Sequence, residues 1–125
     1  MSQPLTFMAV HAHPDDEVTG TGGTFLSLAA QGVRTVLVTS TMGEEGEIVD
    51  PTLDEQARKD LFPRLAEVRR QELQASVEIL KIKELRLLGY RDSGMAGTPA
   101  NNHPDAFWRA NFDEAVRSMV KHIRE

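Results

Sequence analysis

The sequence predicts an α/β fold, a three-layer Rossmann-like arrangement around a parallel sheet. Residues 5–10 and 33–39 are short apolar runs of the length that buried parallel strands need. Residues 24–31 lie between them, have a helical pattern and end at Gly32, as helices commonly do. A strand, a helix and a strand within about thirty residues form a right-handed βαβ unit, which makes the two strands parallel.

The overall composition suits one compact domain and excludes several kinds of partner. The chain has 125 residues, of which 40% are hydrophobic and 26% charged. Its formal net charge of -5 offers no basic face to nucleic acid or to an anionic membrane, so we expect neither as a partner. No stretch has the pattern of a signal peptide or a membrane span, so we expect a cytoplasmic protein. Because cysteine is absent, any metal must be held by histidine and carboxylate side chains.

The first apolar run ends in the sequence His-Ala-His-Pro-Asp-Asp-Glu, at residues 11–17. Ligands of open α/β sheets bind outside the carboxyl ends of the strands, so chemistry is expected here. The period-two alternation of a strand places His11 and His13 on one side, and we expect both imidazoles to face one cleft. Adjacent carboxylates repel one another unless a cation neutralises them, and zinc binds both imidazole nitrogen and carboxylate oxygen. His13 and Asp16 are therefore the expected zinc ligands.

Two other interpretations of this stretch stay open. The Pro-Asp-Asp-Glu sequence also suits the start of a helix, because proline fits the first turn and acidic side chains fit the positive end of the helix dipole. Residues 18–23 are rich in glycine, which favours a functional loop there instead. The glycines also suggest nucleotide binding, but the G-x-G-x-x-G spacing is absent and the carboxylates would repel a pyrophosphate.

The rest of the chain continues the order of strands and helices. The predicted elements are a polar loop at 42–50 after the second strand, one or two helices at 52–83 divided at Pro63, a third strand at 84–88, a long loop at 89–104, and a final amphipathic helix beginning near His103. A loop as long as the one after the third strand is usually functional. Glu44, in the polar loop, fits either a solvated acidic segment or the rim of a pocket.

Several of these motifs together resemble the LmbE-like (PIG-L-type) zinc de-N-acetylases. They are the runs at 11–17, 22–24, 31–33 and 43–47. The run Arg-Asp-Ser-Gly-Met-Ala-Gly-Thr-Pro at 91–99 resembles the mycothiol-pathway branch, with its N-acetylglucosaminyl-inositol deacetylase and mycothiol S-conjugate amidase. The resemblance implies a zinc-dependent hydrolase that removes an N-acetyl (N-acyl) group from an amino sugar or glucosaminyl conjugate.

The resemblance also implies a role for individual residues. Zinc held by His13 and Asp16 would polarise the amide carbonyl and activate water. Asp15, next to these ligands, would be the catalytic acid-base group. Arg69 and Asp92 would bind the sugar. From the pattern alone, Arg69 also fits a surface arginine at the rim of the core, and Asp92 a turn residue.

The chain ends before the family's third zinc ligand, a histidine that follows a fourth strand. The resemblance therefore implies a single, truncated deacetylase domain over residues 1–125, the amino-terminal portion of the LmbE-like fold. In a sheet of order 3-2-1-4 the first strand would then have an open edge. We expect a second copy in a homo-oligomer, a swapped segment or a missing remainder to cover it. The alternative function is a non-catalytic fragment or a sugar-binding remnant.

Overall fold

The computed structural model describes residues 4–125. Three parallel strands form one sheet in the order β1-β2-β3. They are β1 (Thr6–His11), β2 (Arg34–Thr39) and β3 (Glu84–Leu87). Thr39 pairs with His11 of β1 and with Leu87 of β3, so the three strands end at the same level. The expected α/β class and parallel sheet are confirmed, and β1 pairs only with β2 among the described residues.

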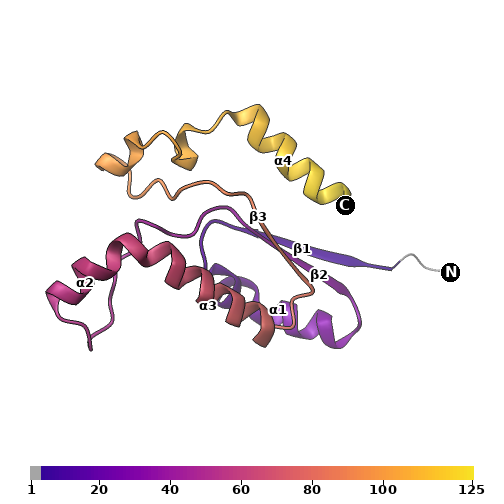
Figure 1. Ribbon diagram of the computed structural model, residues 1–125. Coiled ribbons are helices and arrows are strands. Elements are labelled where there is room, and N and C mark those ends of the chain that lie inside the picture. The colour runs from indigo at the N-terminus through magenta and orange to yellow at the C-terminus, as the bar shows by residue number, and fades with distance from the viewer. Residues whose placement is uncertain (1–3) are drawn as a thin grey trace.

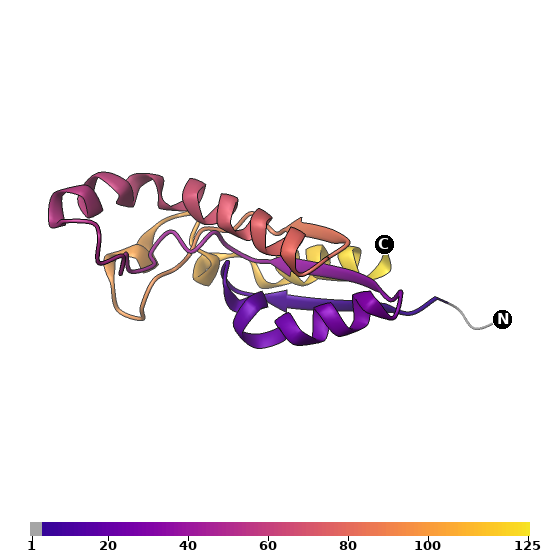
Figure 2. The ribbon, with the colours of Figure 1, turned by 90° about the horizontal axis from the view of Figure 1, so that it is seen from below.

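Helices lie on both sides of this sheet and complete the three layers. They are α1 (Asp16–Ala30), α2 (Glu55–Leu61), α3 (Leu65–Ile79) and α4 (Phe112–Arg124), with short 3-10 turns η1 (Phe62–Arg64), η2 (Pro99–Asn102) and η3 (Phe107–Arg109). α1 and α3 cover one face of the sheet, and α4 lies on the other side (Figures 1 and 2). Within residues 4–125, no helix combines the length and the apolar character that crossing a bilayer requires.

The hydrophobic core lies between the sheet and the pair α1 and α3. Phe25 of α1 and Leu37 of β2 are fully buried, and Leu73 of α3 is 1% exposed. The ring of Phe7 on β1 packs edge-on against Phe25, with ring centroids 5.2 Å apart. Burying a side chain of this size stabilises a fold by about 1.5–3 kcal/mol, so these contacts fix α1 and α3 on the sheet.

The glycine-rich residues 18–23 are helical, which corrects the expected loop. α1 begins at Asp16 and runs through them. A Cβ atom at Gly22 would lie 3.5 Å from Leu80 Cδ2, and one at Gly20 would lie 3.5 Å from His11 Cε1, both at ordinary van der Waals distance. The helix forms despite a penalty of about 1 kcal/mol per glycine. Because these N–H groups bond within a helix, they form no phosphate-binding loop.

The last helix begins later than the sequence predicts. The Asn111 side chain accepts a hydrogen bond from the Glu114 N–H at 3.1 Å and caps α4, whereas the residues near His103 belong to the turn η2 and the chain that follows it. The apolar stripe of α4 is largely solvent-exposed, with Phe112 78% and Ile123 66% exposed. The amphipathic pattern is correct, but within residues 4–125 its apolar side has little to pack against.

Candidate active site

The loops that follow the three strands are joined to one another at one edge of the sheet. Both the N–H and the side-chain hydroxyl of Thr41, after β2, donate to the Ala12 carbonyl after β1, each at 3.0 Å. The Tyr90 N–H, after β3, donates to the Ser40 carbonyl at 3.2 Å. These bonds extend the sheet beyond the strands and hold the three loops in register. The predicted site residues all lie on these loops or border them.

His13 and Asp16 lie together, as the motif predicts. His13 Nδ1 is 3.8 Å from Asp16 Oδ2, and the same oxygen accepts a hydrogen bond from the His13 N–H at 3.0 Å. Zinc binds imidazole nitrogen and carboxylate oxygen at about 2.0–2.2 Å, so two atoms on one ion lie no more than about 4.4 Å apart. The pair fits two positions of a zinc site. Within residues 4–125, no group of three or more His, Cys, Asp or Glu side chains is arranged to hold a metal ion.

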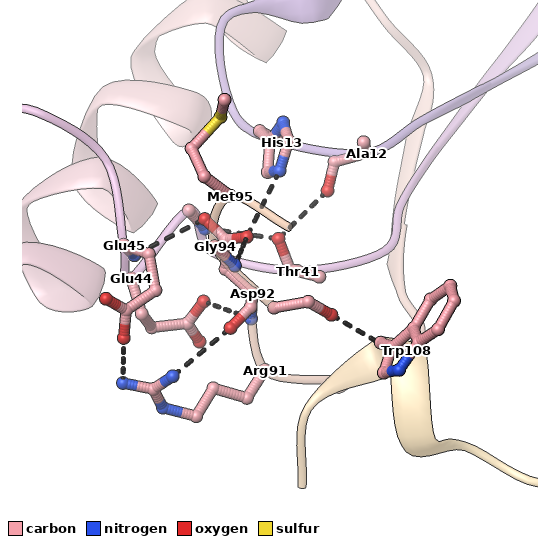
Figure 3. A network of polar contacts seen from close by, with 12 residues as sticks. Ala12, His13, Thr41, Glu44, Glu45, Arg91, Asp92, Gly94, Met95 and Trp108 are labelled. Atoms are coloured by element: carbon pink, nitrogen blue, oxygen red, sulfur yellow. Dashed lines mark hydrogen bonds and ion pairs between the residues drawn. The ribbon is translucent and has the colours of Figure 1, made fainter. Parts of the chain in front are cut away.

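Asp92 lies beside the other ring nitrogen of His13 (Figure 3), since Asp16 is near Nδ1 and Asp92 near Nε2. Its Oδ1 is 3.5 Å from His13 Nε2, and its side chain is only 13% exposed. The N–H groups of Gly94 and Glu45 donate to the two carboxylate oxygens at 3.0 and 3.3 Å. A carboxylate in this position commonly accepts the second ring N–H of a metal-binding histidine and fixes its orientation. Asp92 is therefore placed to orient His13.

Asp92 is itself fixed by a network that joins the loops after β2 and β3. Its N–H donates to Glu44 Oε2 at 2.9 Å, and the Arg91 guanidinium donates to the Asp92 carbonyl at 3.1 Å (Figure 3). Arg91 also forms an ion pair with Glu45. Glu44 thus accepts a backbone hydrogen bond within a network. The sequence alone did not decide between this kind of role and a solvated acidic residue. The sequence did hold a signal for this network, because acidic Glu-Glu follows β2 and Arg-Asp follows the neighbouring strand β3.

Asp15 has a backbone conformation that residues with a side chain rarely adopt. Its φ angle is 101°, in the region that favours glycine. Such a conformation costs about 1–3 kcal/mol, and residues that adopt it cluster at functional sites. The Asp15 side chain is 68% exposed, and its Oδ2 lies 2.7 Å from Arg69 Nη2. The predicted catalytic carboxylate is thus partly open to solvent and paired with a cation.

Arg69 reaches from α3 to the loops after β1 and β2. Besides Asp15, it donates to the carbonyl of Pro14 and, at 3.4 Å, to the carbonyl of Gly43. A Cβ atom at Gly43 would collide with the guanidinium, and one at Gly46 would lie 2.8 Å from Nη1. The glycines of the Gly-Glu-Glu-Gly sequence therefore make room for Arg69. Its side chain is 16% exposed, so it is more buried than a surface arginine.

A cavity of 590 Å³ opens beside Asp15 and Arg69. Val68 and Glu72 of α3 form part of one wall, and Leu53 lies in the loop on the other side. The cavity combines apolar walls with a few charged groups, as sites for small molecules usually do.

The other histidines do not join His13. His11 Nε2 is 2.9 Å from the Thr21 hydroxyl of α1, so His11 has a partner of its own and shares none with His13, and the expected common cleft stays a prediction. The strand ends at His11 and the chain then bends, which breaks the alternation of sides. His103 Nδ1 accepts a hydrogen bond from the Asp105 N–H at 3.1 Å, which is a local turn contact.

The motif-bearing loops and the parallel sheet agree with a sequence comparison. The model of the PIG-L family, described as GlcNAc-PI de-N-acetylase, matches residues 8–125. The chain belongs to the PIG-L family. It is 52% identical over 122 residues to the 1D-myo-inositol 2-acetamido-2-deoxy-alpha-D-glucopyranoside deacetylase 1 of Catenulispora acidiphila, and the match covers 94% of this chain and 38% of that protein. The chain thus spans about two fifths of the length of the curated relatives it matches.

Two solved structures share the fold. The N,N'-diacetylchitobiose deacetylase from Pyrococcus horikoshii matches with a TM-score of 0.57 and 34% identity, over 70% of this chain and 30% of that one. GalB, a 4-carboxy-2-hydroxymuconate hydratase from Pseudomonas putida, matches with a TM-score of 0.57 and 25% identity, over 87% and 38%. Since the fold carries both a deacetylase and a hydratase, the reaction of this PIG-L member must be argued from its own residues.

Proposed function

We propose that the protein is a zinc-dependent hydrolase that removes an N-acetyl (N-acyl) group from an amino sugar conjugate. The observation that carries the proposal is the pairing of His13 with Asp16, next to the carboxylate of Asp15, a residue with a strained backbone. A metal-dependent amide hydrolase uses a Lewis acid and a proton-transfer group at one place. His13 and Asp16 would hold the first, and Asp15 would be the second. The name of the Catenulispora relative supports a glucosaminyl-inositol conjugate as the substrate class.

The residues of the loop would divide the work as follows. His13 and Asp16 would hold the zinc ion, which when bound would polarise the amide carbonyl and lower the pKa of water. An Asp15 carboxylate oxygen would take the proton of the attacking water and later deliver it to the nitrogen of the leaving amine. Asp92 would keep the His13 ring in the orientation that zinc binding needs.

Arg69 and Asp92 are also proposed as contacts for the hydroxyl groups of the sugar. Both border the loop that carries His13 and Asp15, and both are mostly buried, with 16% and 13% of their side chains exposed. A fixed guanidinium and a fixed carboxylate supply the donors and acceptors that orient a polyhydroxylated substrate. The cavity beside Asp15 is the proposed space for part of that substrate.

A catalytic zinc usually has three protein ligands, and residues 4–125 supply two in this proposal. We propose that the third donor comes from a second copy of the chain, a swapped segment or a further part of a longer protein, any of which would also cover the open edge of β1. A sugar-binding protein without hydrolysis is the second candidate function, favoured by the same missing ligand. The assignment of residues 1–125 as one domain and the cytoplasmic location stay predictions.

Release of acetate from an N-acetylglucosaminyl-inositol substrate, with zinc content measured on the same samples, tests the proposal. We expect Asp15→Asn to lower turnover by at least about 100-fold and to keep its zinc, because the base is lost while the ligands stay. His13→Ala should lose both zinc and activity, and His103→Ala, which alters a local turn, should lose neither. Equal loss of zinc and activity in Asp15→Asn would contradict this division of roles.

A further inference from the structure

Glu17 is a buried charged residue that the proposed reaction does not use. It lies in the first turn of α1 and is only 1% exposed. Glutamate is almost never fully buried unless its carboxylate is paired or hydrogen-bonded, because desolvation of the charge is unfavourable. Its burial next to the zinc-binding loop therefore calls for a specific set of partners.

Both carboxylate oxygens of Glu17 have such partners, on two different segments. Oε2 accepts a hydrogen bond from the Asp15 N–H at 3.0 Å. Oε1 accepts one from the hydroxyl of Ser76, on α3, at 2.7 Å. The carboxylate thus connects the backbone of the loop to a helix 59 residues further along the chain.

The residue held in this way is the one with the strained backbone. Asp15 has a φ angle of 101°, and glycine would adopt this conformation most readily. Glycine has no carboxylate, so a base at this position requires that other contacts hold the backbone. These contacts are Glu17 on the N–H, and Arg69 on the side chain and on the preceding Pro14 carbonyl.

Helix capping alone does not account for Glu17. A carboxylate in the first turn that bonds the N–H of the N-cap residue, here Asp15, stabilises a helix start without being buried. The second bond, to Ser76, reaches α3, which also carries Arg69. Ser76 and Arg69 are seven residues apart, about two helical turns, and therefore lie on one side of α3. α3 holds Asp15 twice, directly through Arg69 and indirectly through Ser76 and Glu17.

We propose that Glu17 is a positioning residue that, together with Ser76 and Arg69, clamps Asp15 in the conformation in which its carboxylate acts as the base. The inference rests on the proposed function for the role of Asp15, but the clamp itself is a property of the backbone. It predicts that the hydrogen bonds of Glu17, rather than its charge, are what Asp15 needs. A glutamine can reproduce both bonds, because its oxygen accepts from Asp15 and its NH2 group donates to Ser76.

The test compares Glu17→Ala, Glu17→Gln and Ser76→Ala with the control Ser27→Ala, which removes an exposed hydroxyl of α1. Hydrogen exchange of the Asp15 amide is measured by NMR on the 125-residue chain without metal, with core amides of β2 as a reference for global opening. We expect exchange to rise at least about tenfold in Glu17→Ala and by less in Ser76→Ala, with the core amides unchanged. Glu17→Gln should stay within about threefold of the wild type, and Ser27→Ala should match it.

Unchanged exchange at Asp15 in Glu17→Ala, or a Glu17→Gln variant as fast as Glu17→Ala, would overturn the clamp. If Glu17→Ala does not fold, the comparison of Ser76→Ala with Ser27→Ala decides, and equal exchange in those two overturns it. In acetate-release assays Ser76→Ala should lower kcat and leave KM unchanged, and a kcat equal to that of Ser27→Ala would count against the proposal. The exchange data need neither zinc nor substrate, so they test the clamp alone. A protein that keeps the clamp but releases no acetate would contradict only the proposed function.

Discussion

The loop after β1 and the α4 side of the sheet differ in how many contacts this chain provides to their side chains. At the carboxyl end of the strand, Asp15, Asp16 and Asp92 all have polar partners from this chain. On the face of the sheet opposite α1 and α3, where α4 lies, Val10 of β1 is 48% exposed and Phe112 of α4 is 78% exposed. The chain itself thus supplies the supports of the proposed catalytic loop, whereas we propose that the third zinc ligand and the cover for the apolar surface come from elsewhere.

The largest effect on the catalytic end is expected from Arg69→Ala. It removes the cation paired with Asp15 and the donor to the Pro14 and Gly43 carbonyls. We expect kcat to fall by about 100-fold, because losing the contacts of a positioned catalytic group costs on the order of 2–3 kcal/mol. The matched control is Arg70→Ala, a neighbouring exposed arginine, which should leave kcat within about twofold. Similar losses of kcat in the two variants would show that the contacts of Arg69 have no specific role in turnover.

Asp92→Ala should weaken zinc binding without abolishing it. The substitution removes the carboxylate beside His13 Nε2 but leaves both proposed ligands. Loss of such an orienting group usually lowers metal affinity by about 10–100-fold. A competition titration with a chromogenic chelator measures the change, and Asp113→Ala in the first turn of α4 is the control. An affinity equal to that of the wild type would mean that Asp92 does not act through His13.

A smaller effect is expected where strands β2 and β3 are joined. Hydrogen bonds from Arg86 and Arg34 hold the pKa of Glu84 below its ordinary value of 4.5. A carboxyl group with a lowered pKa in the folded state stabilises the fold above the pKa of the unfolded chain, and this contribution is lost as the pH falls through the folded value. Glu84→Gln should therefore have a lower Tm than the wild type at pH 7, and the difference should shrink as the pH falls below 4.5 and through the lowered pKa of Glu84. A constant difference in Tm across this range would contradict the linkage.

The smallest effect should come from the exposed stripe of α4. Phe112→Gln replaces a side chain that is 78% exposed, so the free energy of unfolding should change by less than about 0.5 kcal/mol. Phe25→Ala, in the fully buried core, should cost about 3–5 kcal/mol in the same urea titration. If a second copy covers the stripe, Phe112→Gln should also lower the mass measured by sedimentation. A cost above 1 kcal/mol in a monomer would show that this surface is already packed.

Most of the fold follows from local patterns, with two exceptions. The apolar runs located all three strands, and the periodicity located α3 and α4. The loop predicted over residues 18–23 is helical, and its Gly22 lies near Leu80, a contact that no local pattern reveals. The start of α4 was misplaced because the Asn111 cap follows two short 3-10 turns that resemble the beginning of a helix.

The sequence predicted the pairing of His13 with Asp16, but not the residues that hold the loop around them. The spacing of His13 and Asp16 predicted a pair, and the two lie within 3.8 Å of each other. The contact of Arg69 with Asp15 depends on how α3 packs beside the sheet, 54 residues away in the sequence. Glu17 was not singled out as a support, because its burial and its bond to Ser76 exist only in the folded chain.

The central claim is that His13 and Asp16 bind zinc, and elemental analysis tests it most directly. The 125-residue chain and His13→Ala are loaded with zinc, dialysed against a weak chelator and compared. The account predicts about one zinc ion per wild-type chain and its loss in His13→Ala, with Asp15→Asn like the wild type. Zinc near one in both samples would contradict it, and zinc near zero in both would show that the third donor lies outside residues 1–125.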